Sequence, residues 1–161
     1  HAGGNWDLKR WPAASFRRWL EAYLTRTSDA IVLCGTQAEG PLIRRIAAGI
    51  SSERVLDLAG RTDLSELAWI LRDAEFLLTN DSGPMHVAAS QNTPIVGLFG
   101  PTSPALTGPV TPAPSELLRV DVGCEVPCYY RACDRRVCME GIETEAVLDA
   151  CLRLRASRGR P

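Results

Sequence analysis

The sequence predicts an α/β fold: a Rossmann-like parallel sheet with flanking helices. Short apolar runs alternate along the chain with longer amphipathic runs, which is the pattern of successive βα units. A small polar loop that contains glycine follows each of the first four apolar runs. The length of 161 residues, with 45% hydrophobic and 23% charged residues, is typical of one ordinary globular domain. We therefore predict a single domain over residues 1–161, in which residues 124–161 form a cysteine-rich segment and a C-terminal helix.

Five short segments are predicted to be strands because they are rich in aliphatic residues and bounded by turn formers. They are residues 30–34, 54–58, 75–79, 94–99 and 116–122. Four longer segments with helical periodicity are predicted to be helices: residues 13–26, 39–48, 64–72 and 84–90. Pro12 suits the start of the first helix, and Thr62-Asp63 supplies N-caps for the third. Residues 100–114 are rich in Pro, Thr and Ser and are predicted to be a loop.

The first five residues, His-Ala-Gly-Gly-Asn, have the composition of a loop that follows a strand. The chain also begins with histidine and not with methionine. We therefore expect it to be part of a longer protein.

Charge and hydropathy exclude several classes of function. A net charge of -1 and a pI near 6.2 argue against the broad basic surface that nucleic acid or anionic lipid requires, so any anion site must be local. The longest apolar stretches, such as residues 94–99, are far shorter than the roughly 18 residues of a membrane span, and no signal-peptide pattern is present. Six cysteines suggest a disulfide framework, but such frameworks belong mainly to small chains without a core. A reducing cytosol is favoured.

The polar loops follow the carboxyl ends of the predicted strands. They are residues 35–36, 60–62, 80–83 and 100–102. In an open parallel sheet these ends share one edge, and ligands bind in the crevice outside it. A tight turn explains the glycine in any single loop. Four loops together, with residues 1–5 as a fifth, favour a binding crevice.

The run from Thr79 to Ala89 is the most specific in the sequence. Ser82, Gly83 and Pro84 join a strand to a helix, so backbone N–H groups and the positive end of the helix face the crevice. Such an arrangement seats a phosphate, since Gly83 permits close approach and Ser82 offers its hydroxyl. Asp81 would repel an anion and is predicted to cap the helix or to accept hydrogen bonds from sugar or ribose hydroxyls.

Three further residues carry hydrogen-bond donors near this edge. His86 lies about one turn into the helix and can offer an N–H to a phosphate or a sugar, although a lone histidine is often structural. Lys9 or Arg10, just ahead of the first helix, can offset the negative charge that develops on a departing diphosphate. The alternative is a solvated basic pair beside a packed tryptophan.

These stretches resemble glycosyltransferase family 9, whose best-known members are the ADP-heptose:lipopolysaccharide heptosyltransferases. Residues 80–89, followed by residues 93–102, are similar to the signature region of that family. The Lys9-Arg10-Trp11-Pro12 element, Cys128 and Cys138-Met139 also match its pattern. The resemblance covers essentially the whole chain.

The resemblance implies the C-terminal, donor-binding domain of a GT-B glycosyltransferase. The family transfers heptose from ADP-heptose to the lipopolysaccharide core with inversion, and it needs neither a metal nor another cofactor. By position, Lys9 resembles the catalytic lysine that contacts the donor phosphates. The other residues that match donor contacts are Asp81, Ser82, Gly83 and His86 for the diphosphate and sugar, and Asn5, Glu39, Arg61 and Thr62 for the nucleotide.

The resemblance also implies partners that this chain does not contain. They are an N-terminal acceptor domain, which holds the general base, and a lipid A-core acceptor at the cytoplasmic face of the inner membrane. The enzyme would be cytoplasmic and peripheral to that membrane. Many relatives carry an aromatic or basic residue after the Pro101-Thr102 loop, whereas this chain continues with residues 103–107, Ser-Pro-Ala-Leu-Thr, which leaves the donor sugar open. The alternatives are a related enzyme for another nucleotide sugar and a non-catalytic nucleotide- or metal-binding module.

The remaining motif is a group of four cysteines: Cys124, Cys128, Cys133 and Cys138. Four thiols in so short a span are able to hold zinc, but the spacings are not the paired C-x2-C of common zinc sites. Zinc and disulfide pairing stay open, and free or packed thiols are favoured. Cys34 and Cys151 lie in apolar contexts and are expected in the core.

Overall fold

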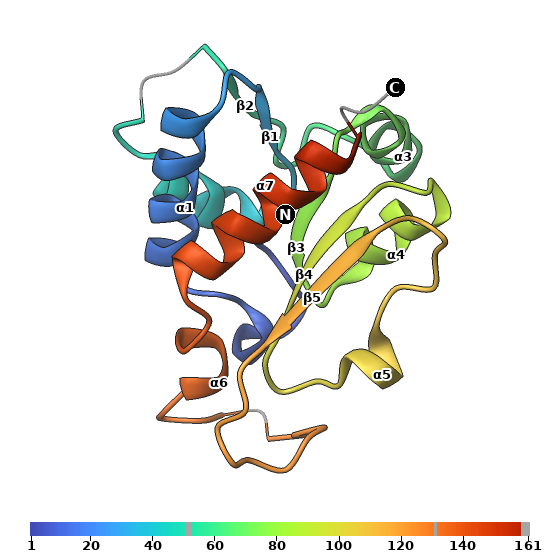
Figure 1. The fold of residues 1–161 in the computed structure, drawn as a ribbon. Helices are drawn as coiled ribbons and strands as arrows, with labels where there is room; N and C mark the ends of the chain where they lie inside the picture. The colour runs from blue at the N-terminus through green and yellow to red at the C-terminus, as the bar shows by residue number, and fades with distance from the viewer. Residues whose placement is uncertain (51–52, 131, 159–161) are drawn as a thin grey trace.

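Parallel strands and the helices that connect them form the scaffold of the protein (Figure 1). The computed structural model describes residues 1–50, 53–130 and 132–158. The strands are β1 (Ile31–Leu33), β2 (Val55–Asp57), β3 (Leu77–Asn80), β4 (Ile95–Phe99) and β5 (Ser115–Arg119). The helices are α1 (Ala13–Arg26), α2 (Gly40–Ala47), α3 (Leu64–Asp73), α4 (Gly83–Ser90), α5 (Pro104–Thr107), α6 (Val137–Glu140) and α7 (Thr144–Arg158), with 3-10 turns η1 (Asp7–Lys9) and η2 (Gln37–Glu39).

All strand pairs in the described part of the chain are parallel, which confirms the predicted fold class. β1 pairs with β2, and β3, β4 and β5 form a second sheet with β4 in the middle. The alternation of apolar and amphipathic runs predicted one parallel sheet. Within the residues described, β1 and β3 do not pair, and a cavity separates them.

The predicted strands and helices are all present, with ends displaced by at most three residues. Asp63 is the N-cap of α3, since its carboxylate accepts from the N–H of Glu66 at 2.8 Å while the Glu66 side chain accepts from the N–H of Asp63 at 2.8 Å. The capping prediction is therefore confirmed for Asp63. The prediction that residues 100–114 are entirely loop was wrong, because the short helix α5 begins there at Pro104.

Alternate side chains of the strands pack on opposite faces of the larger sheet. Leu78 and Val96 pack with α1 and α7, whereas Leu77, Ile95 and Phe99 pack with α3 and α4. Figure 1 shows α1 and α7 on one side of the sheet and α3 and α4 on the other. The sheet is therefore covered on both faces, as parallel sheets require.

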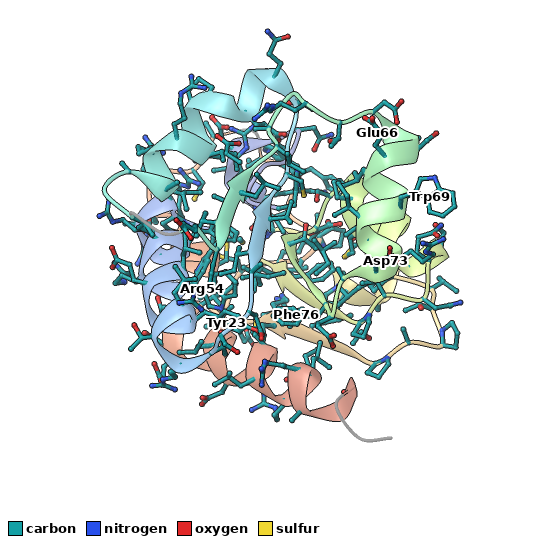
Figure 2. All side chains as sticks on the ribbon, turned by 90° about the horizontal axis from the view of Figure 1, so that it is seen from above. Tyr23, Arg54, Glu66, Trp69, Asp73 and Phe76 are labelled. Carbon is teal, nitrogen blue, oxygen red and sulfur yellow. The ribbon has the colours of Figure 1, made fainter. Side chains whose placement is uncertain are left out.

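Helices α1 and α7 pack against each other, and their aromatic and aliphatic side chains share one core cluster. Trp19 and Tyr23 of α1 stack with ring centroids 5.2 Å apart, and Tyr23 meets Phe76 edge-on at 5.8 Å (Figure 2). Cys151 of α7 is fully buried in this cluster, and Cys34 is buried after β1, which confirms both as core residues. Burial raises the pKa of the Cys151 thiol.

A carboxylate joins the same two helices just before β1. Asp29 accepts hydrogen bonds from the Tyr23 hydroxyl at 2.7 Å and from Arg155 Nε and a terminal guanidinium nitrogen at 2.6 and 2.9 Å. The Arg155 hydrogen bonds, helped by the Tyr23 hydroxyl, hold the pKa of Asp29 below its ordinary value of 3.8. Burial, together with the hydrogen bond to Asp29, raises the pKa of Tyr23.

We predict that Asp29→Asn lowers the free energy of unfolding at pH 7 by about 1 kcal/mol, a value discounted for the partial exposure of the pair. Because the pKa of Asp29 is depressed in the folded state, its contribution is present above pH 3.8 and is lost as the pH falls through the folded value. The stability difference between the two proteins should therefore shrink below pH 4. Urea unfolding at pH 7, 4 and 3 measures it, with Glu21→Gln on the exposed face of α1 as control. A difference that stays constant down to pH 3 would contradict the ion-pair explanation.

Candidate functional site

A cleft of about 820 Å³ opens at the carboxyl ends of the strands. It is lined by residues 35–36 after β1, 62–64 after β2 and 81–84 after β3, together with residues from the N-terminal segment 1–10. These loops converge as predicted. The fourth predicted loop, residues 100–102, does not line the cleft; it is buried against Cys128 and Met139, and only Thr107 of α5 beyond it reaches the cleft.

The cleft brings together eight of the nine predicted donor-binding residues. They are Asn5, Lys9, Glu39, Thr62, Asp81, Ser82, Gly83 and His86. Arg61 is exposed and is not among the described residues that line the cleft, although the next residue, Thr62, does line it.

Lys9 and Asp81 form an ion pair on the cleft wall. Lys9 Nζ lies 2.9 Å from Asp81 Oδ2, and the Thr107 hydroxyl donates to the same oxygen at 3.0 Å. Asp81 is buried, with 4% of its surface exposed. Turn η1 places Lys9 there, with the ammonium 5.7 Å from the centre of the Trp6 ring. The predicted capping role of Asp81 was wrong: Ser82 is the N-cap residue of α4, and the Asp81 carboxylate turns to Lys9 and Thr107 instead.

The start of α4 forms the adjoining part of the wall. Its first residue, Gly83, is exposed, and a Cβ at this position would meet nothing within 4 Å. The Ser82 hydroxyl lies 3.1 Å from Thr79 Oγ1 and 3.2 Å from His1 Nδ1, which fixes its position. His86 is exposed in the first turn of the helix and also lines the cleft. The helix start therefore presents backbone N–H groups and positive partial charge to open space.

Glu39 links two of the loops that line the cleft. Its carboxylate accepts from the N–H of Gly4 at 2.8 Å and from the N–H and hydroxyl of Thr36 at 2.8 and 3.0 Å, and it lies 3.5 Å from His1 Nε2. The backbone of Gly3 approaches it so closely that a Cβ there would lie 1.7 Å from Glu39 Oε1. Both oxygens are thus engaged with the protein. A direct nucleotide contact by Glu39 stays a prediction.

Asn80 was not predicted as a functional residue, yet its side chain connects the N-terminal segment and the start of α1 to the end of β3. Its side chain is fully buried, donates to the carbonyls of Ala2 and Gly3, each at 2.9 Å, and accepts from the N–H of Trp11 at 3.1 Å. The signal in the sequence was an amide at the end of an otherwise apolar strand. Arg10, the neighbour of Lys9, donates to the carbonyl of Gly4 and so holds the same loop.

The cleft therefore combines one anion-attracting region with many neutral hydrogen-bonding groups. Lys9 and the start of α4 supply positive charge, and Asn5, Thr62, Ser82 and Thr107 supply amide and hydroxyl groups. Lys9 is the one lysine in a sequence with 18 basic residues. This set suits a ligand that carries both phosphate and hydroxyl groups.

The late cysteines lie away from this cleft. All six cysteines of the chain are free thiols; Cys124 and Cys133 are exposed, and Cys128 and Cys138 are half-buried. Burial raises the pKa of Cys138. Among the described residues, the four thiols do not gather into a group that could hold a metal ion. A separate finding concerns membrane spans. Among residues 1–50, 53–130 and 132–158, every helix is too short or too polar to cross a membrane.

We predict that Asn80→Ala lowers the free energy of unfolding by about 2–4 kcal/mol, because it leaves two buried carbonyls and one buried N–H without their partner. Asn5→Ala, in the same segment but exposed, is the matched control and should change stability by less than about 0.5 kcal/mol. Urea unfolding followed by circular dichroism measures both. Equal effects of the two variants would show that Asn80 does not hold the edge together.

Comparison with known proteins identifies the family. Residues 2–134 match the profile of glycosyltransferase family 9 (heptosyltransferase). The chain is 31% identical over 134 residues to lipooligosaccharide heptosyltransferase 2 of Haemophilus influenzae, covering 77% of this chain and 38% of that protein. It is 32% identical over 136 residues to lipopolysaccharide heptosyltransferase 1 of Pseudomonas aeruginosa, covering 84% of this chain and 36% of that protein.

A solved structure has the same fold. The structure of ADP-heptose lipopolysaccharide heptosyltransferase II from Escherichia coli superposes with a TM-score of 0.83 and 26% identity, covering 99% of this chain and 46% of that chain. The chain thus spans less than half the length of these relatives, and its α/β fold matches part of a GT-B heptosyltransferase. The resemblance expected from residues 80–102 is confirmed, and the chain belongs to glycosyltransferase family 9.

Proposed function

We propose that this chain is the donor-binding, C-terminal half of a two-domain GT-B enzyme that transfers heptose from ADP-heptose to the lipopolysaccharide core. Transfer proceeds with inversion and without a metal. The observation that carries the proposal is the cleft in which Lys9 and the start of α4 lie side by side at the carboxyl edge of the strands. The E. coli relative is named for ADP-heptose, which supports the choice of donor.

The diphosphate binds at the start of α4. Gly83 leaves open space where any side chain would project, so a phosphate can approach the backbone N–H groups directly. Ser82 adds a hydroxyl whose position is fixed by Thr79 and His1. His86, one turn further along, offers an imidazole N–H to the same diphosphate or to the sugar.

Lys9 stabilises the leaving group. When the bond between the sugar and the diphosphate breaks, its electron pair moves onto a phosphate oxygen, and a fixed ammonium nearby offsets the new charge. Asp81 holds the ammonium at 2.9 Å and so keeps it at the cleft wall. The carboxylate oxygens of Asp81 also accept hydrogen bonds from hydroxyls of the sugar or the ribose.

The remaining predicted residues serve the nucleoside end of the donor. Asn5 and Thr62 line the cleft with an amide and a hydroxyl. Glu39 acts chiefly by shaping the loops of Gly4 and Thr36, and Arg61 reaches the ligand only if its exposed side chain swings toward the cleft. Many relatives continue the Pro101-Thr102 loop with an aromatic or basic residue, whereas this chain has residues 103–107, of which Thr107 lines the cleft. A related nucleotide sugar is therefore the second candidate donor.

The acceptor binds elsewhere in the full-length enzyme. Removal of the proton from an acceptor hydroxyl needs a base within hydrogen-bond reach, and the polar residues of this cleft are assigned to the donor. The base and the acceptor site therefore belong to the N-terminal domain. That domain meets the lipid A-core acceptor at the cytoplasmic face of the inner membrane, which makes the enzyme cytoplasmic and peripheral to that membrane.

Because the diphosphate is proposed to bind at the start of α4, we predict that Gly83→Val weakens ADP binding by about a hundredfold or more. The fold should persist, since the added side chain enters open cleft space. Lys9→Met should weaken ADP about tenfold more than adenosine, because it removes a cation and leaves the buried Asp81 charge beside the phosphates. Calorimetry with ADP and adenosine measures both, and titration with UDP and GDP tests the nucleotide base.

The controls for these variants lie outside the cleft. Ala156→Val on the exposed face of α7 adds similar bulk, and Arg17→Met on α1 removes a cation, and neither should change ADP affinity. Equal losses of ADP and adenosine affinity in Lys9→Met would refute the phosphate assignment. Undetectable ADP binding by the unmodified chain at millimolar concentration would count against the donor-domain assignment itself.

We further predict that the isolated chain binds ADP but does not transfer heptose, because transfer needs donor, acceptor and base held in near-attack geometry. An assay with ADP-heptose and a lipid A-core acceptor measures turnover by this chain and by the full-length enzyme. The full-length enzyme should be active and the isolated chain inactive. Clear turnover by the isolated chain would show that it carries its own base.

A further inference from the structure

Lys9 lies in a short turn that needs support from elsewhere in the protein. The 3-10 turn η1 (Asp7–Lys9) is closed by the N–H of Lys9, which donates to Trp6 O at 3.0 Å, and by that of Arg10, which donates to Asp7 O at 3.1 Å. The hydrogen bonds of a 3-10 turn have poor geometry, so a single turn has little stability of its own. Its position is therefore set by contacts with other segments.

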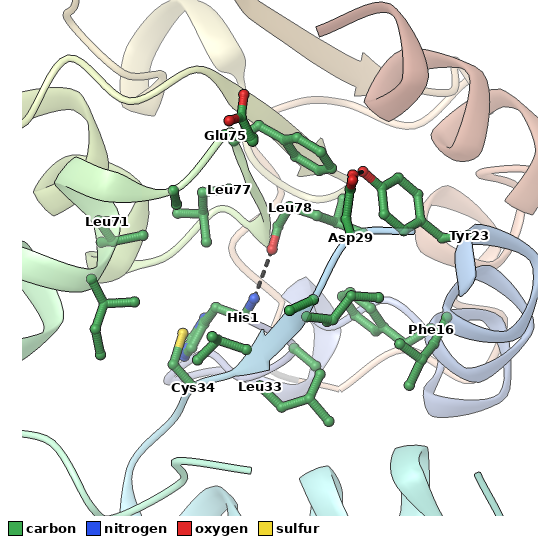
Figure 3. A pocket seen from close by; sticks show the side chains of 18 of the residues that line it. His1, Phe16, Tyr23, Asp29, Leu33, Cys34, Leu71, Glu75, Leu77 and Leu78 are labelled. Atoms are coloured by element: carbon green, nitrogen blue, oxygen red, sulfur yellow. Dashed lines mark hydrogen bonds between the residues drawn. The ribbon is translucent and has the colours of Figure 1, made fainter. Parts of the chain in front are cut away.

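The N-terminal segment is attached on both sides of this turn. Ahead of it, the amino group of His1 donates to Leu78 O at 2.7 Å (Figure 3). Behind it, the N–H of Trp11 donates to Asn80 Oδ1 at 3.1 Å. Both attachments lie outside residues 7–9. The backbone of the turn itself needs a further anchor.

Arg136 supplies that anchor from the far end of the sequence. Its Nη2 donates to Asp7 O at 2.7 Å and to Arg10 O at 3.2 Å. One terminal guanidinium nitrogen carries two hydrogens, so it can serve both carbonyls at once. The carbonyls belong to the first residue of η1 and to the residue that follows the turn. A single side chain therefore spans the whole turn.

The backbone of Arg136 is fixed by its own neighbours. Its carbonyl accepts from the N–H groups of Met139 at 3.1 Å and Glu140 at 3.0 Å, where α6 begins. Met139 is fully buried in the core. Just after the helix, Ile142 O accepts from the indole N–H of Trp11 at 3.0 Å. The side chain of Arg136 thus extends from a fixed base.

The backbone conformation of Arg136 points to a role for its side chain. Its φ is +39° and its ψ is 22°, in the left-handed region. Glycine adopts this region freely, whereas a residue with a Cβ is strained there. Glycine would serve better at a position that only had to begin α6. The strain is explained if the contacts of the arginine side chain offset it.

We propose that Arg136 is a positioning residue for Lys9. By holding both ends of η1, it keeps the Lys9 ammonium at the cleft wall, 2.9 Å from Asp81 Oδ2. The part that Lys9 plays toward a donor diphosphate rests on the proposed function, whereas the contact between Arg136 and the turn requires no ligand. Arg136 is not among the described residues that line the cleft, so it acts through Lys9. The cysteine-rich segment thereby takes part in the site without touching the donor.

The reactivity of Lys9 tests the contact directly, because Lys9 is the one lysine of the sequence. Arg136→Met removes the N–H donors, and Arg136→Gly removes them while also relieving the backbone strain. Both should raise the rate at which an amine-reactive ester acylates Lys9 by about fivefold, since the turn opens more often. Peptide mass spectrometry measures this rate.

Two further variants show whether the effect belongs to the hydrogen bonds of Arg136. Arg136→Lys should acylate at Lys9 within about twofold of the unmodified rate, because one ammonium can donate to both carbonyls. Arg135→Met removes the neighbouring exposed guanidinium and is the matched control, with no change expected. Circular dichroism checks that each variant is folded.

Calorimetry with ADP adds a reading that a general loss of stability would not reproduce. Arg136→Met should weaken ADP binding by about fivefold in the unmodified chain, but by less than about twofold in the Lys9→Met protein, where no ammonium is left to position. This difference between the two backgrounds is the signature of a residue that acts through Lys9.

The outcomes separate this proposal from the proposed function. Unchanged acylation of Lys9 in both Arg136→Met and Arg136→Gly would overturn it. So would equal losses of ADP affinity with and without Lys9, because Arg136 would then act on the cleft as a whole. If the unmodified chain does not bind ADP, the proposed function fails, and the acylation rates alone decide whether Arg136 positions Lys9.

Discussion

The arrangement of the cleft depends on one buried amide, that of Asn80. Its nitrogen donates to Ala2 and Gly3 and its oxygen accepts from Trp11, so a single side chain fixes the N-terminal segment and the entry of α1 to the end of β3. Lys9 lies between these two attachment points. The position of its ammonium at Asp81 is therefore set by backbone that Asn80 holds, and not by the long and flexible lysine side chain alone.

Asp81 is a buried carboxylate beside the start of α4, where an anion is proposed to bind. The charge of Asp81 opposes a phosphate, but it also neutralises Lys9. Without it, the ammonium of Lys9 would be partly removed from water with no counterion, which costs free energy. The start of α4 carries partial positive charge that no side chain caps. Under the proposed function, the attraction for a diphosphate comes mainly from the helix end and backbone N–H groups, while Lys9 would offset the charge that grows when the donor bond breaks.

Much of the fold was predictable because its signals are local. The Asp63 cap, the entry of α1 at Pro12 and the apolar runs of β3 and β4 each follow from a few adjacent residues. The convergence of the loops followed from the parallel topology. The contacts of Asn80 with Ala2 and Gly3, and of Glu39 with Gly4, did not, because these partners lie 35 or more positions away and only the folded chain brings them together. The pairing of Asp81 with Lys9, 72 positions apart, displaced the expected cap for the same reason.

His1 links the cleft to the end of β3. Its Nδ1 lies 3.2 Å from the Ser82 hydroxyl and its Nε2 lies 3.5 Å from Glu39 Oε2, while its amino group donates to Leu78 O at 2.7 Å. Asn80 fixes the next two residues, Ala2 and Gly3, through their carbonyls. With these contacts in place, the Ser82 hydroxyl and the Glu39 carboxylate have few alternative orientations. Under the proposed function, the cleft is therefore preorganised by contacts within the protein rather than by the ligand.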